Sequence, residues 1–231
     1  MTHQEDSTTI AQAATGNGCA GLIAHLSWAL HLDEAQAAKV AEIAAQWSDT
    51  SEGQYAFDRC ESPAERLFLI GGRLCETIGI GWRGPTDDAD GWWGNAVARV
   101  WREDEPPESR DDVQIIVQAS LGTVSRRRPD FLFICRASPW NVILDVEIDG
   151  HDYHSTKEQL GDDHARDIDL LMLPGGIQTI RFTGSQVYAN PVECFASALD
   201  VLDAMVMRQR RTARIALAAA AAVAGLRGAA E

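Results

Sequence analysis

The hydrophobic pattern of the chain predicts one α/β domain. Short β-branched and apolar runs predict strands over 113–119, 129–137, 142–150 and 177–184. Apolar residues at helical spacing predict helices before, between and after them. The order helix, three strands, helix, strand, helix predicts a mixed central β-sheet flanked by helices on both faces. In it, the last two strands run parallel through a crossover helix at 156–173.

Local signals predict where individual helices begin and end. Ser62, Pro63 and Glu65 form a capping box with proline at the first helical position. Asn190-Pro191 begins a helix with one apolar face, made of Val192, Phe195, Leu199, Leu202 and Val206. The crossover helix is expected to present Leu160, Ile168, Leu171 and Met172 on its apolar side and to stop at Pro174-Gly175-Gly176.

The remaining segments complete the expected domain organisation. Residues 20–47 predict two N-terminal helices, and 81–110 reads as loop with a short helix from Asn95 to Trp101. We expect a disordered leader at 1–18, a helical appendage at 19–60, an α/β domain at 61–207 with an insert at 82–110, and a basic, Ala-rich helix at 208–231.

Composition restricts the class of protein. The 231 residues are 45% hydrophobic, contain no apolar run of membrane-spanning length, and begin without the pattern of a secretory signal. Five scattered cysteines without a CxxC pair predict neither a zinc site nor a disulfide framework, and Cys75 and Cys135 look like core residues. A reduced, cytoplasmic chain is expected.

The strand at 142–150 carries the candidate chemistry. Alternation puts Val142, Leu144, Val146 and Ile148 on one face, whereas Asp145, Glu147 and Asp149 lie on the other. If 129–137 and 142–150 form a hairpin centred between Ser138 and Pro139, Asp130 lies opposite Glu147. Carboxylates roughly 5 Å apart repel each other unless a proton or a cation lies between them, and oxygen ligands suit Mg²⁺.

A cation held by two carboxylates suits phosphodiester hydrolysis, because it can bind a phosphate oxygen and acidify a bound water. The nearby His151, His154, Lys157 and Arg166 could orient water, donate protons or meet phosphate oxygens.

Each of these residues also has a purely structural interpretation. Asp130 could be a turn or strand-start residue, and the three acids of 142–150 could form the solvated face of an edge strand. Glu65 could serve only the helix cap, and Arg181 could be a structural partner of a carboxylate. The histidines and the Arg126–Arg128 run could be solvated surface. The joint pattern favours the nuclease interpretation.

The pattern from Pro129-Asp130 to Glu147-Ile148-Asp149 resembles the PD-(D/E)XK signature of restriction-endonuclease-like enzymes. A longer run is similar to the branch related to very-short-patch-repair endonucleases, and the likeness covers residues 62–205 outside the insert at 82–110. The matching positions of this run are Glu147, Asp149, Gly150, His151, His154, Thr156, Lys157, Gln159, Asp163, Arg166, Asp167, Arg181, Phe182 and Gly184.

The resemblance implies a set of site residues. Asp130, Glu147 and the carbonyl of Ile148 would bind Mg²⁺, or Mn²⁺ in its place, with Glu65 in the outer shell. The signature expects lysine where this chain has Asp149, so His151, Lys157 or Arg166 would supply the missing cation. The residues expected to meet DNA are Arg126, Arg127, Arg128, His154, Gln159 and Arg166.

Two other functions remain open. The net charge of −14 and Asp149 favour a weakly active or inactive nuclease-fold module that binds nucleic acid or a protein, although the charge is unevenly distributed and 126–128 and 208–214 are basic. A third interpretation is a Mg²⁺ enzyme acting on a small phosphorylated substrate. The chain has no Walker-type phosphate loop, which argues against an NTPase.

Overall fold

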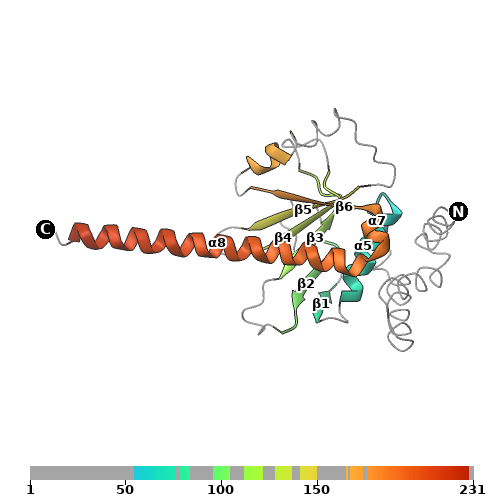
Figure 1. The fold of residues 1–231 in the computed structure, drawn as a ribbon, viewed down its shortest axis with the longest axis horizontal. Helices are drawn as coiled ribbons and strands as arrows, with labels where there is room; N and C mark the ends of the chain where they lie inside the picture. The colour runs from blue at the N-terminus through green and yellow to red at the C-terminus, as the bar shows by residue number, and fades with distance from the viewer. Residues whose placement is uncertain are drawn as a thin grey trace.

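The computed structural model describes residues 55–75, 79–83, 96–104, 112–121, 128–136, 141–149, 165, 167–173 and 176–228, with side chains up to 221. They form an α/β fold around a mixed six-stranded sheet, as the sequence predicts at this coarse level (Figure 1). The elements are α5 (Pro63–Leu74), β1 (Ile80–Arg83), β2 (Ala98–Arg102), β3 (Val113–Val117), β4 (Phe131–Cys135), β5 (Val142–Asp149), β6 (Gln178–Thr183), α7 (Gly184–Ala189) and α8 (Pro191–Gly228).

The sheet follows the order of the chain. Each of the strands β1 to β4 pairs antiparallel with the next strand, and β5 and β6 form the one parallel pair among the described strands. This confirms the predicted parallel arrangement of 142–150 and 177–184. In the β4–β5 hairpin Phe131 is opposite Val146 and Leu132 is opposite Asp145, which is the predicted register. One further step in that register sets Asp130 opposite Glu147.

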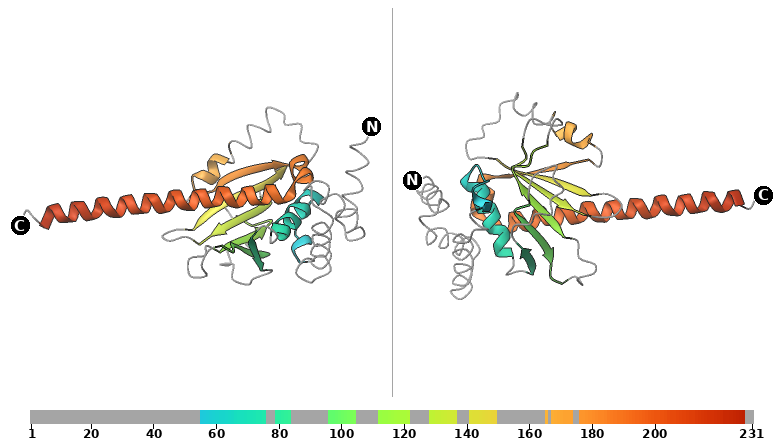
Figure 2. Two further views of the ribbon diagram at one scale, coloured as in Figure 1. Left: turned by 60° about the horizontal axis from the view of Figure 1, so that its bottom comes forward. Right: turned by 180° about the vertical axis from the view of Figure 1, so that it is seen from behind.

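Two apolar layers cover the sheet. On one face α5, α7 and α8 enclose the larger core (Figures 1 and 2). Phe68 of α5 is its centre, with ring centroids 4.9 Å from Phe131 and 5.3 Å from Phe195. The other face carries a smaller cluster that includes Leu132, Ile134, Leu170 and Ile177. The alternation predicted for β5 is confirmed, because Val142, Leu144, Val146 and Ile148 belong to the larger core.

The segment 81–110 contains two strands that the sequence does not predict. The short helix expected from Asn95 to Trp101 is wrong, since 98–102 is β2 and 80–83 is β1. Gly81 is opposite Trp101 in the β1–β2 register, and a Cβ atom on Gly81 would lie 2.2 Å from the indole. Because glycine has no side chain, the indole can lie over this position of β1. Cross-strand packing of this kind overrides local propensity.

The crossover segment buries a different face from the predicted one. Residues 167–171 are helical, but Ile168, Leu171 and Met172 are exposed and Leu170 is buried against the sheet. A hydrogen bond at the end of the helix explains why Leu170 faces the sheet. The amide of Ile177, just before β6, donates to the carbonyl of Leu170 at 3.0 Å and fixes this side of the helix next to the strand. Leu160 and residues 174–175 of the predicted stop lie outside the described residues.

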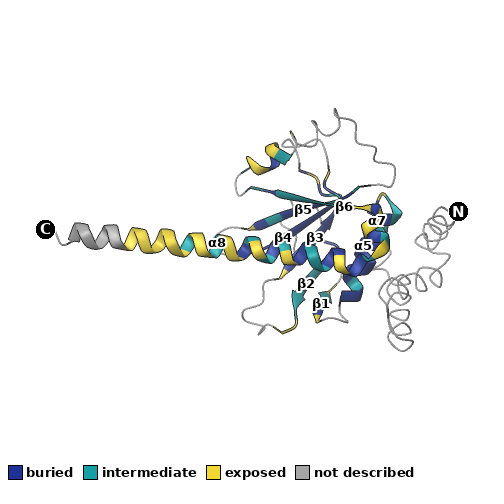
Figure 3. Cartoon of the chain, in the orientation of Figure 1, coloured by how far each residue is buried: buried dark blue, intermediate teal, exposed yellow. Residues whose placement is uncertain are grey.

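Helix α8 crosses the sheet and continues past it (Figure 1). Asn190 caps it by accepting from the amide of Glu193 at 3.1 Å, and the predicted apolar face from Val192 to Val206 is buried. From Arg211 to Ala221 most of its residues are exposed (Figure 3). None of the described helices is long and apolar enough to span a membrane. The two helices expected within 20–47 lie outside the described residues.

Candidate metal site at the sheet end

Six elements meet at one end of the sheet, and the predicted carboxylates lie among them. Helix α5 begins there, β3 and β5 end there, β4 begins there, and α7 follows directly after the end of β6. Three acidic residues come from three of these elements: Glu65 from the first turn of α5, Asp130 from the entry into β4, and Glu147 from β5. The observed β4–β5 register, continued by one residue, sets Asp130 opposite Glu147, as the hairpin prediction expects.

Asp130 is held from two sides. Its Oδ2 accepts a hydrogen bond of 2.7 Å from the amide of Ile148, and its Oδ1 accepts one of 3.3 Å from the side-chain amide of Gln118. The pKa of Asp130 is raised to about 7, mainly by burial and in smaller part by the nearby carboxylates of Glu65 and Asp145, against the lowering effect of the two hydrogen bonds. The fold thus keeps an acid where its charge is unfavourable.

Glu65 does more than cap a helix. Ser62 Oγ accepts from the amide of Glu65 at 3.2 Å, which confirms one half of the capping box. In the other half, the carboxylate of Glu65 accepts a hydrogen bond of 2.9 Å from the amide of Glu61, one residue before the cap, and not from the amide of Ser62. The same Oε2 atom accepts from Gln118 Nε2 at 3.1 Å, and Glu65 is only 4% exposed. Its buried carboxylate therefore belongs to the site as well as to the helix start.

Gln118 is the residue of this site that the sequence analysis missed. Its side-chain nitrogen donates to both Glu65 and Asp130, and its backbone amide donates to the carbonyl of Asp130 at 2.9 Å. The available signal is its position, because it is the first residue after the fully buried strand β3. A long polar side chain at a strand end is common, so this signal alone does not distinguish it.

The three acids of β5 differ in their surroundings. Strand β5 lies between β4 and β6, so the interpretation of a solvated edge strand is wrong. Asp145 is fully buried and accepts from Thr179 Oγ1 at 3.0 Å, which gives it a structural role. Glu147 and Asp149 are partly exposed at the end of the strand. They are the members of the row that solvent or a ligand can reach.

The backbone of Ile148 fits the role of a third oxygen donor. Its amide is directed toward β4, and the carbonyl of a strand residue points to the same neighbour as its amide. Continuing the hairpin register by two steps sets Pro129 opposite Ile148. Proline has no N–H, so it cannot form the ladder bond to that carbonyl. The proline before Asp130 therefore leaves a backbone oxygen unclaimed by the hairpin beside two carboxylates.

The donor set therefore fits a hard divalent cation. Asp130, Glu147 and the Ile148 carbonyl offer oxygen atoms only, which is the chemistry that Mg²⁺ and Mn²⁺ prefer. Within the described ranges, no three His, Cys, Asp or Glu side chains are grouped closely enough to enclose a metal by themselves. A cation at this place would therefore rely on the backbone oxygen and on water, as Mg²⁺ commonly does.

Two arginines near the site are already engaged. Arg181 lies beside Glu147 in the β5–β6 register, but its guanidinium forms two bonds of 2.9 Å to Asp167, as the structural interpretation of Arg181 expects. Arg128 pairs with Glu61 at the surface. The predicted site residues His151, Lys157, His154, Gln159, Arg166, Arg126 and Arg127 lie outside the described residues.

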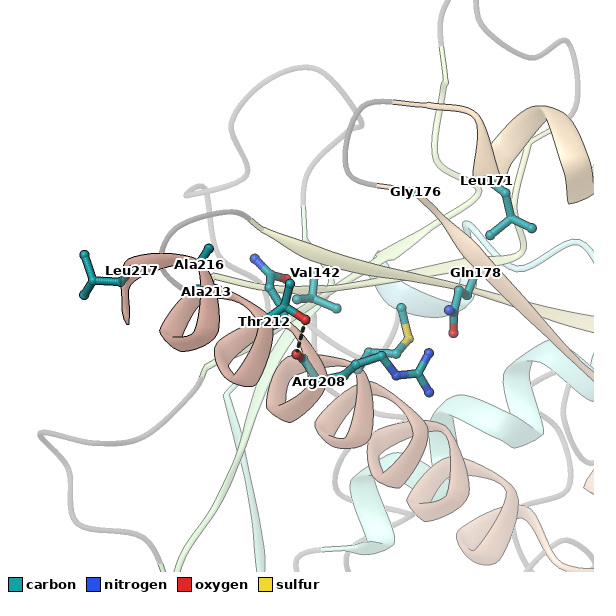
Figure 4. A pocket seen from close by; sticks show the side chains of 11 residues that line it. Val142, Leu171, Gly176, Gln178, Arg208, Thr212, Ala213, Ala216 and Leu217 are labelled. Atoms are coloured by element: carbon teal, nitrogen blue, oxygen red, sulfur yellow. Dashed lines mark hydrogen bonds between the residues drawn. The ribbon is translucent and has the colours of Figure 1, made fainter. Parts of the chain in front are cut away.

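A groove of about 660 Å³ lies at the opposite end of β5 (Figure 4). It opens where α8 passes the sheet, between Val142, Leu171 and Met205, and Arg208 is the charged side chain among the described residues that line it. Val142 and Asp149 are at opposite ends of the strand, so this groove is separate from the carboxylates.

Comparison with known proteins yields no match to a family model, to a curated protein or to a solved structure.

Proposed function

We propose that this chain is a divalent-metal-dependent nuclease of the restriction-endonuclease-like type, which hydrolyses phosphodiester bonds of DNA. One observation carries the proposal: Asp130 is partly buried opposite Glu147 and near the buried Glu65, at a point where Pro129 leaves the Ile148 carbonyl without a ladder partner. Negative groups gathered at one place are unfavourable without a cation to offset them.

In the proposed enzyme, Asp130 and Glu147 hold Mg²⁺ together with the Ile148 carbonyl. The cation would stabilise charge on a phosphoryl oxygen and make a bound water acidic enough to act as nucleophile. Asp130 binds it as the anion. Because burial raises the pKa of Asp130 to about 7, we expect metal-dependent activity to rise from pH 6 to pH 8 as this carboxyl loses its proton.

The test is cleavage of supercoiled plasmid, nicked duplex and single-stranded DNA at pH 8 with Mg²⁺ or Mn²⁺. Wild type should cut at least one of them, chelator should stop the reaction, and Glu147→Ala and Asp130→Ala should each lower the rate at least a hundredfold. Asp169→Ala removes an exposed carboxylate of the crossover helix and should leave the rate unchanged. No metal-dependent cut by wild type over the whole panel would contradict the proposal.

A second function is favoured by one observation at the same place. Asp149 stands where the resembled signature has lysine, and the neighbouring Arg181 is paired with Asp167. A chain without a cation beside the attacking water could bind nucleic acid or a protein without cutting. Salt-dependent DNA binding with no turnover in any metal would favour this alternative.

A further inference from the structure

Gln118 occupies a backbone conformation that its residue type rarely adopts. Its φ is +51°, in the left-handed region, and it is the one non-glycine residue with positive φ in the described part of the chain. Glycine and asparagine adopt this region more readily, because a longer side chain carries a steric cost there. A conformation of this kind persists only when its surroundings enforce it, and such positions cluster at functional sites.

The side chain shows what the conformation achieves. Gln118 Nε2 is 3.1 Å from Glu65 Oε2 and 3.3 Å from Asp130 Oδ1, so one amide group donates to two carboxylates whose residues are far apart in the sequence. The backbone amide of Gln118 is fixed as well, by the carbonyl of Asp130 at 2.9 Å. The backbone and the side chain of Gln118 are therefore both hydrogen-bonded to Asp130, the residue just before β4.

We propose that Gln118 is a positioning residue that holds the carboxylates of Glu65 and Asp130 together for the cation of the proposed nuclease site. This inference rests on the proposed function. Each N–H of the amide offsets part of the repulsion between the two acids. A carboxylate accepts several hydrogen bonds or metal contacts, so a bond to Gln118 leaves Asp130 lone pairs for a metal. Outer partners of this kind orient metal ligands and commonly change metal affinity by about 10- to 100-fold.

The experiment measures Mn²⁺ affinity of the full chain by calorimetry at pH 8, without DNA. Gln118→Gly removes the side-chain amide and also removes the steric cost of the left-handed backbone conformation. Gln118→Asn keeps an amide and suits the conformation, but it is one methylene too short to reach both acids. Ser120→Gly is the matched control, since it adds the same backbone freedom two residues away at an exposed position. Circular dichroism identifies the variants that are folded, and the asparagine variant carries the test if the glycine variant is not.

We expect both Gln118 variants to bind Mn²⁺ at least tenfold more weakly than wild type and the Ser120 control. Cleavage by these variants should recover at saturating Mn²⁺, because the amide orients ligands and does not touch the reacting atoms. Wild-type affinity in both variants would overturn this inference, and so would a loss of cleavage that saturating metal does not restore. Absence of Mn²⁺ binding by wild type itself would instead refute the proposed function.

Discussion

Replacing Asp130 with asparagine is expected to stabilise the protein in alkaline solution without metal. The substitution keeps the size of the side chain and an oxygen that can accept from the amide of Ile148, but it removes the charge. In wild type that charge is unfavourable, because the side chain is buried near the carboxylates of Glu65 and Asp145, and together these effects raise the pKa of Asp130 from 3.8 to about 7. An uncharged residue avoids this cost.

The direction and size follow from proton linkage. A carboxyl group whose pKa is higher in the folded than in the unfolded chain keeps its proton longer in the folded state. The unfolding free energy of wild type therefore falls as pH rises from about 4 to about 7, and levels off above the folded pKa. At 1.36 kcal/mol for each pKa unit, the contribution of Asp130 changes by about 2.5 kcal/mol between pH 5 and pH 8.

The assay is urea unfolding at pH 5, 6, 7 and 8 in chelator, for wild type, Asp130→Asn and the control Asp169→Asn, which changes an exposed aspartate. The difference between Asp130→Asn and wild type should grow in favour of the variant by about 2.5 kcal/mol over this range, and the control should follow wild type. Curves for Asp130→Asn and wild type that stay parallel from pH 5 to pH 8 would refute the reasoning.

Three further predictions concern the fold. Gly72→Ala should lower the unfolding free energy by about 1–3 kcal/mol in urea titrations, because its Cβ would lie 2.4 Å from the ring of Phe195 where α5 meets α8; an unchanged midpoint would contradict this close packing. Deleting 212–231 should change that free energy by less than about 1 kcal/mol, because most of the described side chains there are exposed, and a larger loss would show that this part of α8 supports the domain. Cys75 should react with a thiol reagent at pH 8 far more slowly than after unfolding, because it is buried and burial raises its pKa to about 12; equal rates in peptide mapping would contradict its place in the core.

Local chemistry explains why much of the site could be predicted. The alternation along 142–149 follows from the two-residue period of a strand. The hairpin register follows from a loop too short to permit many alternatives, so Asp130 and Glu147 could be set opposite each other from the chain alone. The helix starts at Ser62 and Asn190 depend on side chains that bond to amides three residues away.

The wrong predictions share a different cause. The strand at 98–102 and the buried side of 167–171 depend on what packs against them, namely Gly81 under Trp101 and the sheet under Leu170. Most of these partners are distant in the sequence, and the local composition favours other structures. Tertiary packing decides such segments when their own propensity is weak.

The sequence by itself determined the α/β architecture and the two facing acids of the β4–β5 hairpin, because both depend on periodicity and on short loops. Only the tertiary structure decided that Glu65 and Gln118, 53 residues apart, share one hydrogen bond. It also decided that Asp130 is buried enough to have a pKa of about 7. Burial and long-range contacts exist only after the chain has folded, so no spacing of residues could have predicted them.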